Sequence, residues 1–184
     1  MNPAMALKLN VLALYGVAAV LALAFAFQFA LGELPCPLCL LQRIQFAALA
    51  IGPLLNVRFG CRPSHYALSL LAAVLGAAVA MRQVFLHILP GDAGYGAAIL
   101  GYHYYTWAFV LFAAAIVLIA IVMLFDGQFA PPASSETKVG PVAAVAAWLV
   151  IGLTALNVVT TLLECGFAAC PDDPVVYELL KPRS

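Results

Sequence analysis

Five stretches of apolar residues, each long enough to cross a lipid bilayer, constrain the fold of this chain more than any other feature. A membrane-spanning helix needs about 20 predominantly apolar residues to cross roughly 30 Å of hydrocarbon. Three of the stretches contain no charged residue, and the other two contain one arginine each. We predict spans at approximately 11–31, 38–57, 66–89, 107–125 and 142–163.

The composition supports a membrane protein and excludes several other classes. Only 9% of the 184 residues are charged, whereas a soluble domain carries about 25%. With a formal net charge of +0 and no basic patch, the chain is neither a nucleic-acid-binding module, nor a cytosolic enzyme, nor a disordered chain. The fold class that we predict is an all-α integral membrane protein. It is an antiparallel transmembrane helix bundle with four core spans plus a fifth, forming a single membrane domain over residues 1–184.

The short loops predict which way the bundle faces. The loop 90–106 has no Lys or Arg, whereas the opposite side carries Lys8, Arg58, Arg62 and Lys138. The positive-inside rule makes that basic side cytoplasmic, although two basic residues of the C-terminal tail oppose this bias. We therefore expect a cytoplasmic N-terminus, a cytoplasmic linker at 126–140 and a tail at 164–184 on the outer side. The first apolar stretch exceeds the 7–15 residues of a signal peptide, so we expect it to remain a helix.

The count of crossings sorts the five cysteines. Cys36 and Cys39 follow the first span, and Cys165 and Cys170 follow the fifth. Both numbers are odd, so both pairs emerge on the outer side, while Cys61 is alone on the cytoplasmic side. Disulfides persist outside the cytosol and not within it, so this distribution favours paired cysteines outside.

Cys36-Pro37-Leu38-Cys39 is a C-x-x-C motif at the start of the second span. Two sulfurs at this spacing close a small ring that exchanges readily, and the positive end of a helix favours a thiolate. Arg43 lies one helical turn further along the same face. Two alternatives remain open, namely a purely structural disulfide and a zinc site that uses all four outer cysteines. The spacing of Cys165 and Cys170 is slightly wide for zinc.

The two arginines within spans are candidate ligand-binding residues. A charge inside a span costs on the order of 2.5–3.5 kcal/mol, and no Asp or Glu inside a span pairs with Arg43 or Arg82. Glu33 and Glu164, at helix ends, are the nearest acids. We therefore expect a bound polar group, such as a quinone carbonyl, a thiolate or a lipid phosphate. Alternatively, Arg43 snorkels to the interface. His87 is either an interfacial side chain or a group for quinone contact or proton transfer.

The segment Pro35-Cys36-Pro37-Leu38-Cys39-Leu40-Leu41-Gln42-Arg43 resembles the signature of the DsbB disulfide-bond-formation proteins of bacterial inner membranes. Shorter similarities run from Arg82-Gln83 to Pro90-Gly91-Asp92 and from Glu164-Cys165-Gly166-Phe167 to Cys170-Pro171-Asp172. The resemblance implies a quinone-dependent thiol oxidase of the inner membrane, with its C-terminus in the periplasm. Electrons pass from the thiols of a periplasmic DsbA-like protein with a thioredoxin fold, through cysteines, to ubiquinone or menaquinone.

The resemblance also implies residue roles. Cys36 and Cys39 become the redox-active pair and Arg43 the arginine beside the quinone. Arg82 and His87 are further cofactor-binding candidates from their positions in the third span alone. The best-known members have four spans and carry a second cysteine pair between spans 3 and 4, where this chain has no cysteine. Cys165 and Cys170 are therefore either a relay to the partner or a clasp for the tail. The rival functions are a membrane scaffold with structural disulfides and a transmembrane thiol electron carrier.

Overall fold

The computed structural model describes residues 1–130 and 139–181. The helices are α1 (Pro3–Ala30), α2 (Pro37–Leu49), α3 (Ile51–Phe59), α4 (Pro63–Leu86), α5 (Tyr104–Met123) and α6 (Pro141–Cys165). Short elements complete the chain: strands β1 (Ala98–Ile99) and β2 (Tyr102–His103), and 3₁₀ turns η1 (Asp126–Phe129) and η2 (Glu178–Leu180). Within the described residues, five helical segments are long and apolar enough to cross a membrane, with α2 and α3 together forming one of them. The predicted all-α membrane bundle is confirmed.

The helices begin where the sequence provides helix starts. Proline occupies the first turn of α1, α2, α4 and α6, where its missing N–H would have no helical partner and its fixed φ suits the helix. At the start of α1, the Asn2 side chain also accepts a hydrogen bond of 2.8 Å from the Met5 N–H. This capped start lies several residues before the predicted span at 11–31. Of the predicted linker 126–140, residues 131–138, including Lys138, lie outside the described part of the chain.

The second span is broken between α2 and α3, a feature that the sequence interpretation did not include. Pro53 has no N–H to donate to the Leu49 carbonyl one turn earlier. The Ser69 hydroxyl of α4 donates to that carbonyl instead, at 2.7 Å. Gly52 permits the close approach, because a Cβ there would collide with Ser69 Oγ and the His65 carbonyl oxygen. The break thus locks this span against α4.

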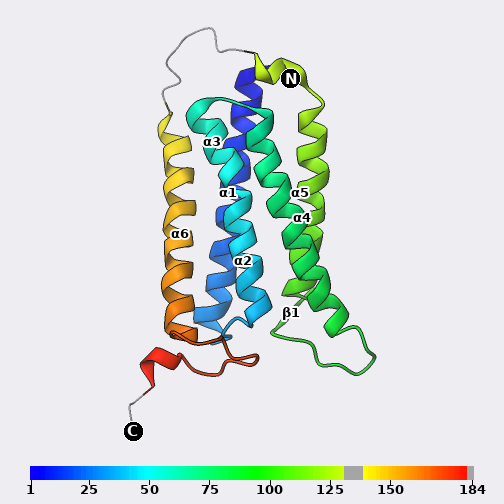
Figure 1. Cartoon of the computed structure of the whole chain (residues 1–184), viewed down its shortest axis with the longest axis vertical. Helices are drawn as coiled ribbons and strands as arrows, with labels where there is room; N and C mark the ends of the chain where they lie inside the picture. The colour runs from blue at the N-terminus through cyan, green and yellow to red at the C-terminus, as the bar shows by residue number, and fades with distance from the viewer. Residues whose placement is uncertain (131–138, 182–184) are drawn as a thin grey trace.

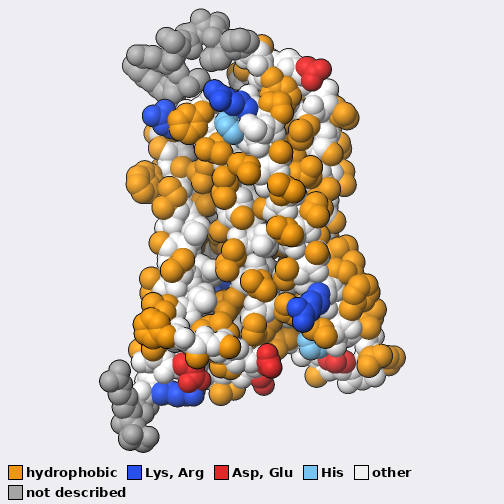
Figure 2. All heavy atoms as spheres, in the orientation of Figure 1, with side chains coloured by type: hydrophobic (Ala, Val, Ile, Leu, Met, Phe, Trp, Pro, Cys, Tyr) orange, Lys and Arg blue, Asp and Glu red, His pale blue; other side chains and the backbone are white. Residues whose placement is uncertain are grey.

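The helices pack as an antiparallel bundle (Figure 1), and its exterior is apolar. α4 packs against α2, α3 and α5, while α1 packs against α3 and α6. Phe46 and Phe112 stack in the core with ring centroids 4.0 Å apart, and the Phe112 ring lies directly against Gly76. Large apolar side chains such as Leu118 and Trp148, 61% and 71% exposed, face outward. Figure 2 shows apolar side chains along the bundle, with charged groups gathered mainly toward its two ends. This is the surface of a multi-pass membrane protein.

Both cysteine pairs lie at the same end of the bundle, which we call the disulfide end (Figure 1). The parity of the crossings predicts this arrangement.

A network of buried amides occupies the opposite end of the bundle. Asn10 Nδ2 donates to Tyr66 Oη at 2.9 Å, and Asn56 Nδ2 donates to Asn10 Oδ1 at 2.9 Å. His65 Nδ1 lies 2.9 Å from Asn56 Oδ1, and Tyr66 Oη donates to Gln128 Oε1 at 2.9 Å. These hydrogen bonds join α1, α3, α4 and η1. They fix how far the helices are shifted along one another, which apolar packing alone does not determine.

Candidate functional site

The C-x-x-C motif forms the first turn of α2. A disulfide joins Cys36 and Cys39, whose Cα atoms are 5.0 Å apart. Cys36 is the N-cap residue of α2, and its Sγ accepts a hydrogen bond of 3.2 Å from the Cys39 N–H. Pro37 occupies the first helical position. The motif therefore places both sulfurs at the positive end of a helix dipole, where negative charge on sulfur is stabilised.

Two glutamines surround these sulfurs with amide groups. Gln83 of α4 is 1% exposed, and its Nε2 donates to Cys36 Sγ at 3.2 Å and to Cys39 Sγ at 3.5 Å. Gln42 Nε2 in turn donates to Gln83 Oε1 at 2.7 Å, which fixes the orientation of the Gln83 amide. Amide donors aimed at sulfur favour a thiolate after reduction. Sequence reasoning assigned no role to either glutamine, although both lie in the stretches that resemble the DsbB family.

Arg43 is directed into the bundle rather than toward the membrane interface. It is 9% exposed. Its Nη1 donates to Gln28 Oε1 at 2.5 Å and its Nη2 to the Ala24 carbonyl at 3.1 Å. The guanidinium carbon also lies 5.0 Å from the centroid of the Phe25 ring. All of these contacts are neutral groups of α1, and the snorkelling interpretation does not describe this arrangement.

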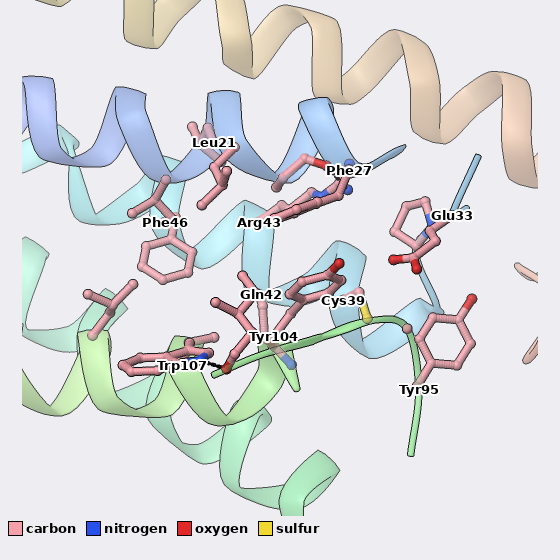
Figure 3. Close-up of a pocket in the computed structure, with 18 of the residues that line it drawn as sticks. Leu21, Phe27, Glu33, Cys39, Gln42, Arg43, Phe46, Tyr95, Tyr104 and Trp107 are labelled. Carbon is pink, nitrogen blue, oxygen red and sulfur yellow. Dashed lines mark hydrogen bonds between the residues drawn. The ribbon is translucent and has the colours of Figure 1, made fainter. Parts of the chain in front are cut away.

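Cys39, Gln42 and Arg43 line one apolar pocket (Figure 3). Its walls come from α1, α2, α5 and the loop between α4 and α5. The cavity volume is about 160 Å³, and a cavity of about 150 Å³ in another protein holds a benzene-sized ring. The volume of the pocket is therefore sufficient for a six-membered ring.

Two tyrosines add polar groups at this pocket. The Tyr104 ring stacks on Phe27 at 4.6 Å, and its buried hydroxyl lies beside the Glu33 carboxylate without a well-formed hydrogen bond to it. Figure 3 shows this hydroxyl on the side of Glu33 and the Cys39 sulfur. Tyr95, from the loop, donates its hydroxyl to the Leu34 carbonyl at 2.7 Å. Burial, with added repulsion from Asp173, Glu164 and Glu33, raises the pKa of Tyr95 to about 12, so its hydroxyl remains a donor at neutral pH.

The second cysteine pair ends α6. A disulfide joins Cys165 to Cys170, with Cα atoms 4.4 Å apart. Cys165 is 6% exposed, and Gly166 ends the helix with φ +64°, a conformation that glycine adopts without strain. The tail then returns to α1, because Gln28 Nε2 donates to Tyr177 Oη at 3.0 Å. Gln28 therefore connects the tail to Arg43.

The other two candidate residues lie away from the pocket. Arg82 is exposed, and neither it nor His87 lines the cavity. His87 Nδ1 lies 3.0 Å from Asp92 Oδ1, and its ring stacks on Tyr105 at 5.5 Å. A hydrogen bond from the Gly94 N–H, followed by one from His87, lowers the pKa of the Asp92 carboxyl. A cofactor-binding role for Arg82 and His87 stays a prediction that the pocket lining does not support.

No metal centre is formed by the described residues, 1–130 and 139–181, since no three His, Cys, Asp or Glu side chains cluster there in a way that could hold an ion.

Part of this chain is similar to known proteins. Residues 7–95 match the model of the family described as disulfide bond formation protein DsbB. A relative from Xanthomonas axonopodis pv. citri, "Disulfide bond formation protein B", is 44% identical over 80 residues, which are 41% of this chain and 46% of the relative. Its namesake from Stutzerimonas stutzeri is 34% identical over 89 residues, or 46% of this chain and 55% of the relative. The chain spans about half the length of these relatives. No solved structure matches it significantly.

The fold and the site together define a multi-pass membrane protein with a C-x-x-C disulfide at the N-terminus of a transmembrane helix. Residues 7–95, which contain this disulfide, Gln83 and Arg43, match the DsbB family, and the relatives support the same assignment. The second cysteine pair lies beyond the matched residues.

Proposed function

We propose that this protein is a quinone-dependent thiol oxidase that supports disulfide bond formation outside the cytoplasm of a bacterium. The observation that carries the proposal is the Cys36–Cys39 disulfide, with its Cys39 sulfur in the wall of an apolar pocket that also contains Arg43. The names of the relatives, each a disulfide bond formation protein, support the same activity.

The residues of the pocket fit a quinone. The walls are mainly apolar and aromatic, as a ring with a hydrocarbon tail requires. Arg43 has five N–H donors, of which hydrogen bonds to Gln28 and Ala24 occupy two. The buried Tyr104 hydroxyl, which lies beside the Glu33 carboxylate without a well-formed hydrogen bond to it, is a second donor for a carbonyl oxygen. When bound, a quinone accepts two electrons and two protons.

The two cysteines have separate tasks in this proposal. Cys39 lines the pocket and Cys36 does not, so Cys39 faces the electron acceptor and Cys36 exchanges with an incoming thiol. The Gln83 amide, within hydrogen-bonding distance of both sulfurs, stabilises thiolate at either one. Arg43 and Tyr104 orient the acceptor and stabilise negative charge on its oxygens. The apolar walls exclude water, which strengthens these electrostatic interactions.

The tail pair is the proposed entry point for electrons. Cys165 and Cys170 lie at the same end of the bundle as Cys36 and Cys39 (Figure 1), and α6 contacts α2. We assign them the relay between a periplasmic DsbA-like thioredoxin-fold protein and the C-x-x-C pair. Lys8, Arg58 and Arg62 support a cytoplasmic N-terminus and an inner-membrane location with a periplasmic disulfide end.

The test uses purified protein in detergent with a short-chain ubiquinone and a reduced thioredoxin-fold partner, and follows quinone absorbance. We expect loss of quinone absorbance in step with oxidation of the partner, one quinone for each disulfide formed. A menaquinone analogue in the same assay identifies the preferred acceptor. No loss of quinone absorbance with any dithiol would refute the proposal.

A further inference from the structure

One face of α6 contains buried polar atoms without partners. Five buried side-chain polar atoms lack a hydrogen-bond partner in the described part of the chain, and four of them belong to α6. They are Asn157 Oδ1, Thr161 Oγ1 and both carboxyl oxygens of Glu164. Glu164 is 0% exposed and Asn157 is 5% exposed. No role is assigned to this face by the proposed function.

These residues form one column along the helix. Positions 157, 161 and 164 are spaced by four and three residues, so their side chains lie above one another on one face. The column extends about 10 Å along α6, at 1.5 Å per residue. α6 packs against α1 and contacts α2, which carry Gln28 and Arg43. The column thus starts near the disulfide end and reaches the depth of Arg43.

Titratable groups from three elements surround Glu164 and Arg43. Arg43 of α2 attracts the Glu164 carboxylate, yet the two groups form no direct hydrogen bond. Tyr95 of the α4–α5 loop interacts with Glu164, Asp173 and Glu33, and Tyr177 of the tail interacts with Arg43; α1 contributes the neutral Gln28. Arg43 retains three N–H donors beyond those used by Gln28 and Ala24. The Glu164 acceptors on α6 and the unused Arg43 donors on α2 therefore interact electrostatically without a direct hydrogen bond.

Buried polar groups in this situation bind water. A carboxyl group without a partner in an apolar interior is costly, and buried waters satisfy such groups with two to four hydrogen bonds each. We propose that the Asn157–Thr161–Glu164 face of α6 holds ordered water, and that Glu164 passes protons between the outer solvent and the Arg43 side of the pocket.

The proposal rests on the proposed function, and the balance of that reaction requires such a path. Oxidation of two thiols to one disulfide releases two electrons and two protons. Reduction of a quinone to the quinol takes up two of each. Electrons move between sulfurs by exchange, but protons released in water must re-enter a pocket with mainly apolar walls. Glu164, when protonated, donates toward the pocket and regains its proton from the disulfide end.

The first experiment compares Glu164→Gln with Glu178→Gln. Both changes replace a carboxylate by an amide, but Glu178 lies in the tail and pairs with Lys181 at 2.6 Å. With dithiothreitol and saturating short-chain ubiquinone, turnover should fall roughly a hundredfold in Glu164→Gln and stay unchanged in Glu178→Gln. Glu164→Asp should recover part of the rate. Unchanged turnover in Glu164→Gln would overturn the proposal.

The second experiment needs no quinone, so it fails independently of the proposed function. Infrared difference spectra are recorded as dithiothreitol reduces the disulfides. We expect a carboxylic C=O band that changes in the wild-type protein and in Glu178→Gln and is missing from Glu164→Gln. Absence of this band from the wild type would overturn the proposal. If Glu164→Gln loses turnover and its melting temperature also falls, and the wild type shows no such band, Glu164 has a structural role instead.

A third variant tests the proposal even if Glu164→Gln fails to fold. Asn157→Leu keeps the size of the side chain and removes a water-binding group while leaving Glu164 in place. It should slow quinone reduction at least severalfold, without changing the rate at which dithiothreitol reduces the disulfides. Equal rates of quinone reduction in Asn157→Leu and wild type would overturn the water path.

Discussion

The Cys36–Cys39 and Cys165–Cys170 disulfides lie at the same end of the bundle, but their surroundings differ. Gln83 Nε2 and the Cys39 N–H donate hydrogen bonds to the sulfurs of the first pair, which borders the pocket. The sulfurs of the second pair accept no hydrogen bond from the described residues, and Cys165 follows the buried Glu164. The first pair is therefore suited to negative charge on sulfur, and the second is not.

The direction of the two helices explains this difference. Cys36 and Cys39 occupy the N-terminus of α2, whereas Cys165 is the last residue of α6. A helix dipole is positive at its N-terminus and negative at its C-terminus, so it favours a thiolate at Cys39 and disfavours one at Cys165. A pair whose reduced form is stabilised is the stronger oxidant. Electrons should therefore run from the tail pair to the C-x-x-C pair, which is the direction of the proposed relay.

The sharpest test of this comparison replaces one cysteine in each pair. Cys39→Ala should abolish quinone reduction by dithiothreitol, a loss of at least a thousandfold, because no disulfide remains at the pocket. Cys165→Ala should leave this reaction near the wild-type rate. Quinone absorbance measures both, and more than a few per cent of turnover in Cys39→Ala would contradict the assignment.

Replacing the whole tail pair tests the relay itself. The double variant Cys165→Ala, Cys170→Ala should lose at least tenfold in oxidation of a thioredoxin-fold partner, while dithiothreitol is still oxidised at Cys36–Cys39. Partner oxidation is followed by thiol alkylation and gel shift. Full activity on the partner would make the tail pair a clasp, and equal loss with both substrates would indicate lost stability.

Replacing Arg43 should affect binding of the quinone more than reaction with the thiol substrate. Loss of a charge-assisted hydrogen bond costs about 1.5–3 kcal/mol, so Arg43→Ala should raise the KM for quinone roughly ten- to a hundredfold. Arg43→Lys should recover only part, since an ammonium lacks the planar set of donors. The measurement is steady-state kinetics at varied quinone, and an unchanged KM would remove Arg43 from the acceptor site.

Gln83 should contribute part of the difference in redox potential between the two disulfides. Gln83→Leu removes the amide that donates to both sulfurs and destabilises the reduced form. A hydrogen bond worth about 1.4 kcal/mol corresponds to about 30 mV for this two-electron couple, so the potential of Cys36–Cys39 should fall by about that amount. Equilibration with glutathione buffers measures it, with Cys165–Cys170 as an internal control that should not move.

The smallest effect is expected at His87. Its contacts are Asp92 and Tyr105, outside the pocket, so His87→Ala should change quinone KM by less than about twofold. A rise comparable to that of Arg43→Ala would restore the predicted cofactor role of His87.

The sequence predicts the parts of the site that depend on local order. A C-x-x-C beside a helix start and an arginine one turn later define Cys36, Cys39 and Arg43 without knowledge of the packing. Gln83 and Tyr104 could not be found in this way, because they reach the site from α4 and α5. Their roles depend on how the helices are rotated about their axes, and an apolar span carries little periodicity to set that rotation.

The break between α2 and α3 is an intermediate case. Pro53 is visible in the sequence and predicts a lost backbone hydrogen bond within the second span. The Ser69 hydroxyl that replaces it lies 20 residues from Leu49, and only the packing of α4 connects the two. The proline could have predicted the break, whereas its compensation could not be predicted.

The amide network at the end opposite the disulfides has a consequence for how the chain enters the membrane. Asn10 is made early in synthesis, yet its partners Asn56 and Tyr66 follow 46 and 56 residues later. Within α1 the Asn10 Nδ2 donates to the Ala6 carbonyl at 2.8 Å, but until Asn56 emerges the Asn10 Oδ1 exposes an acceptor that lipid cannot satisfy. The first helix should therefore remain beside the protein-conducting channel and leave it together with α3 and α4, so that insertion proceeds in a group of helices rather than one helix at a time.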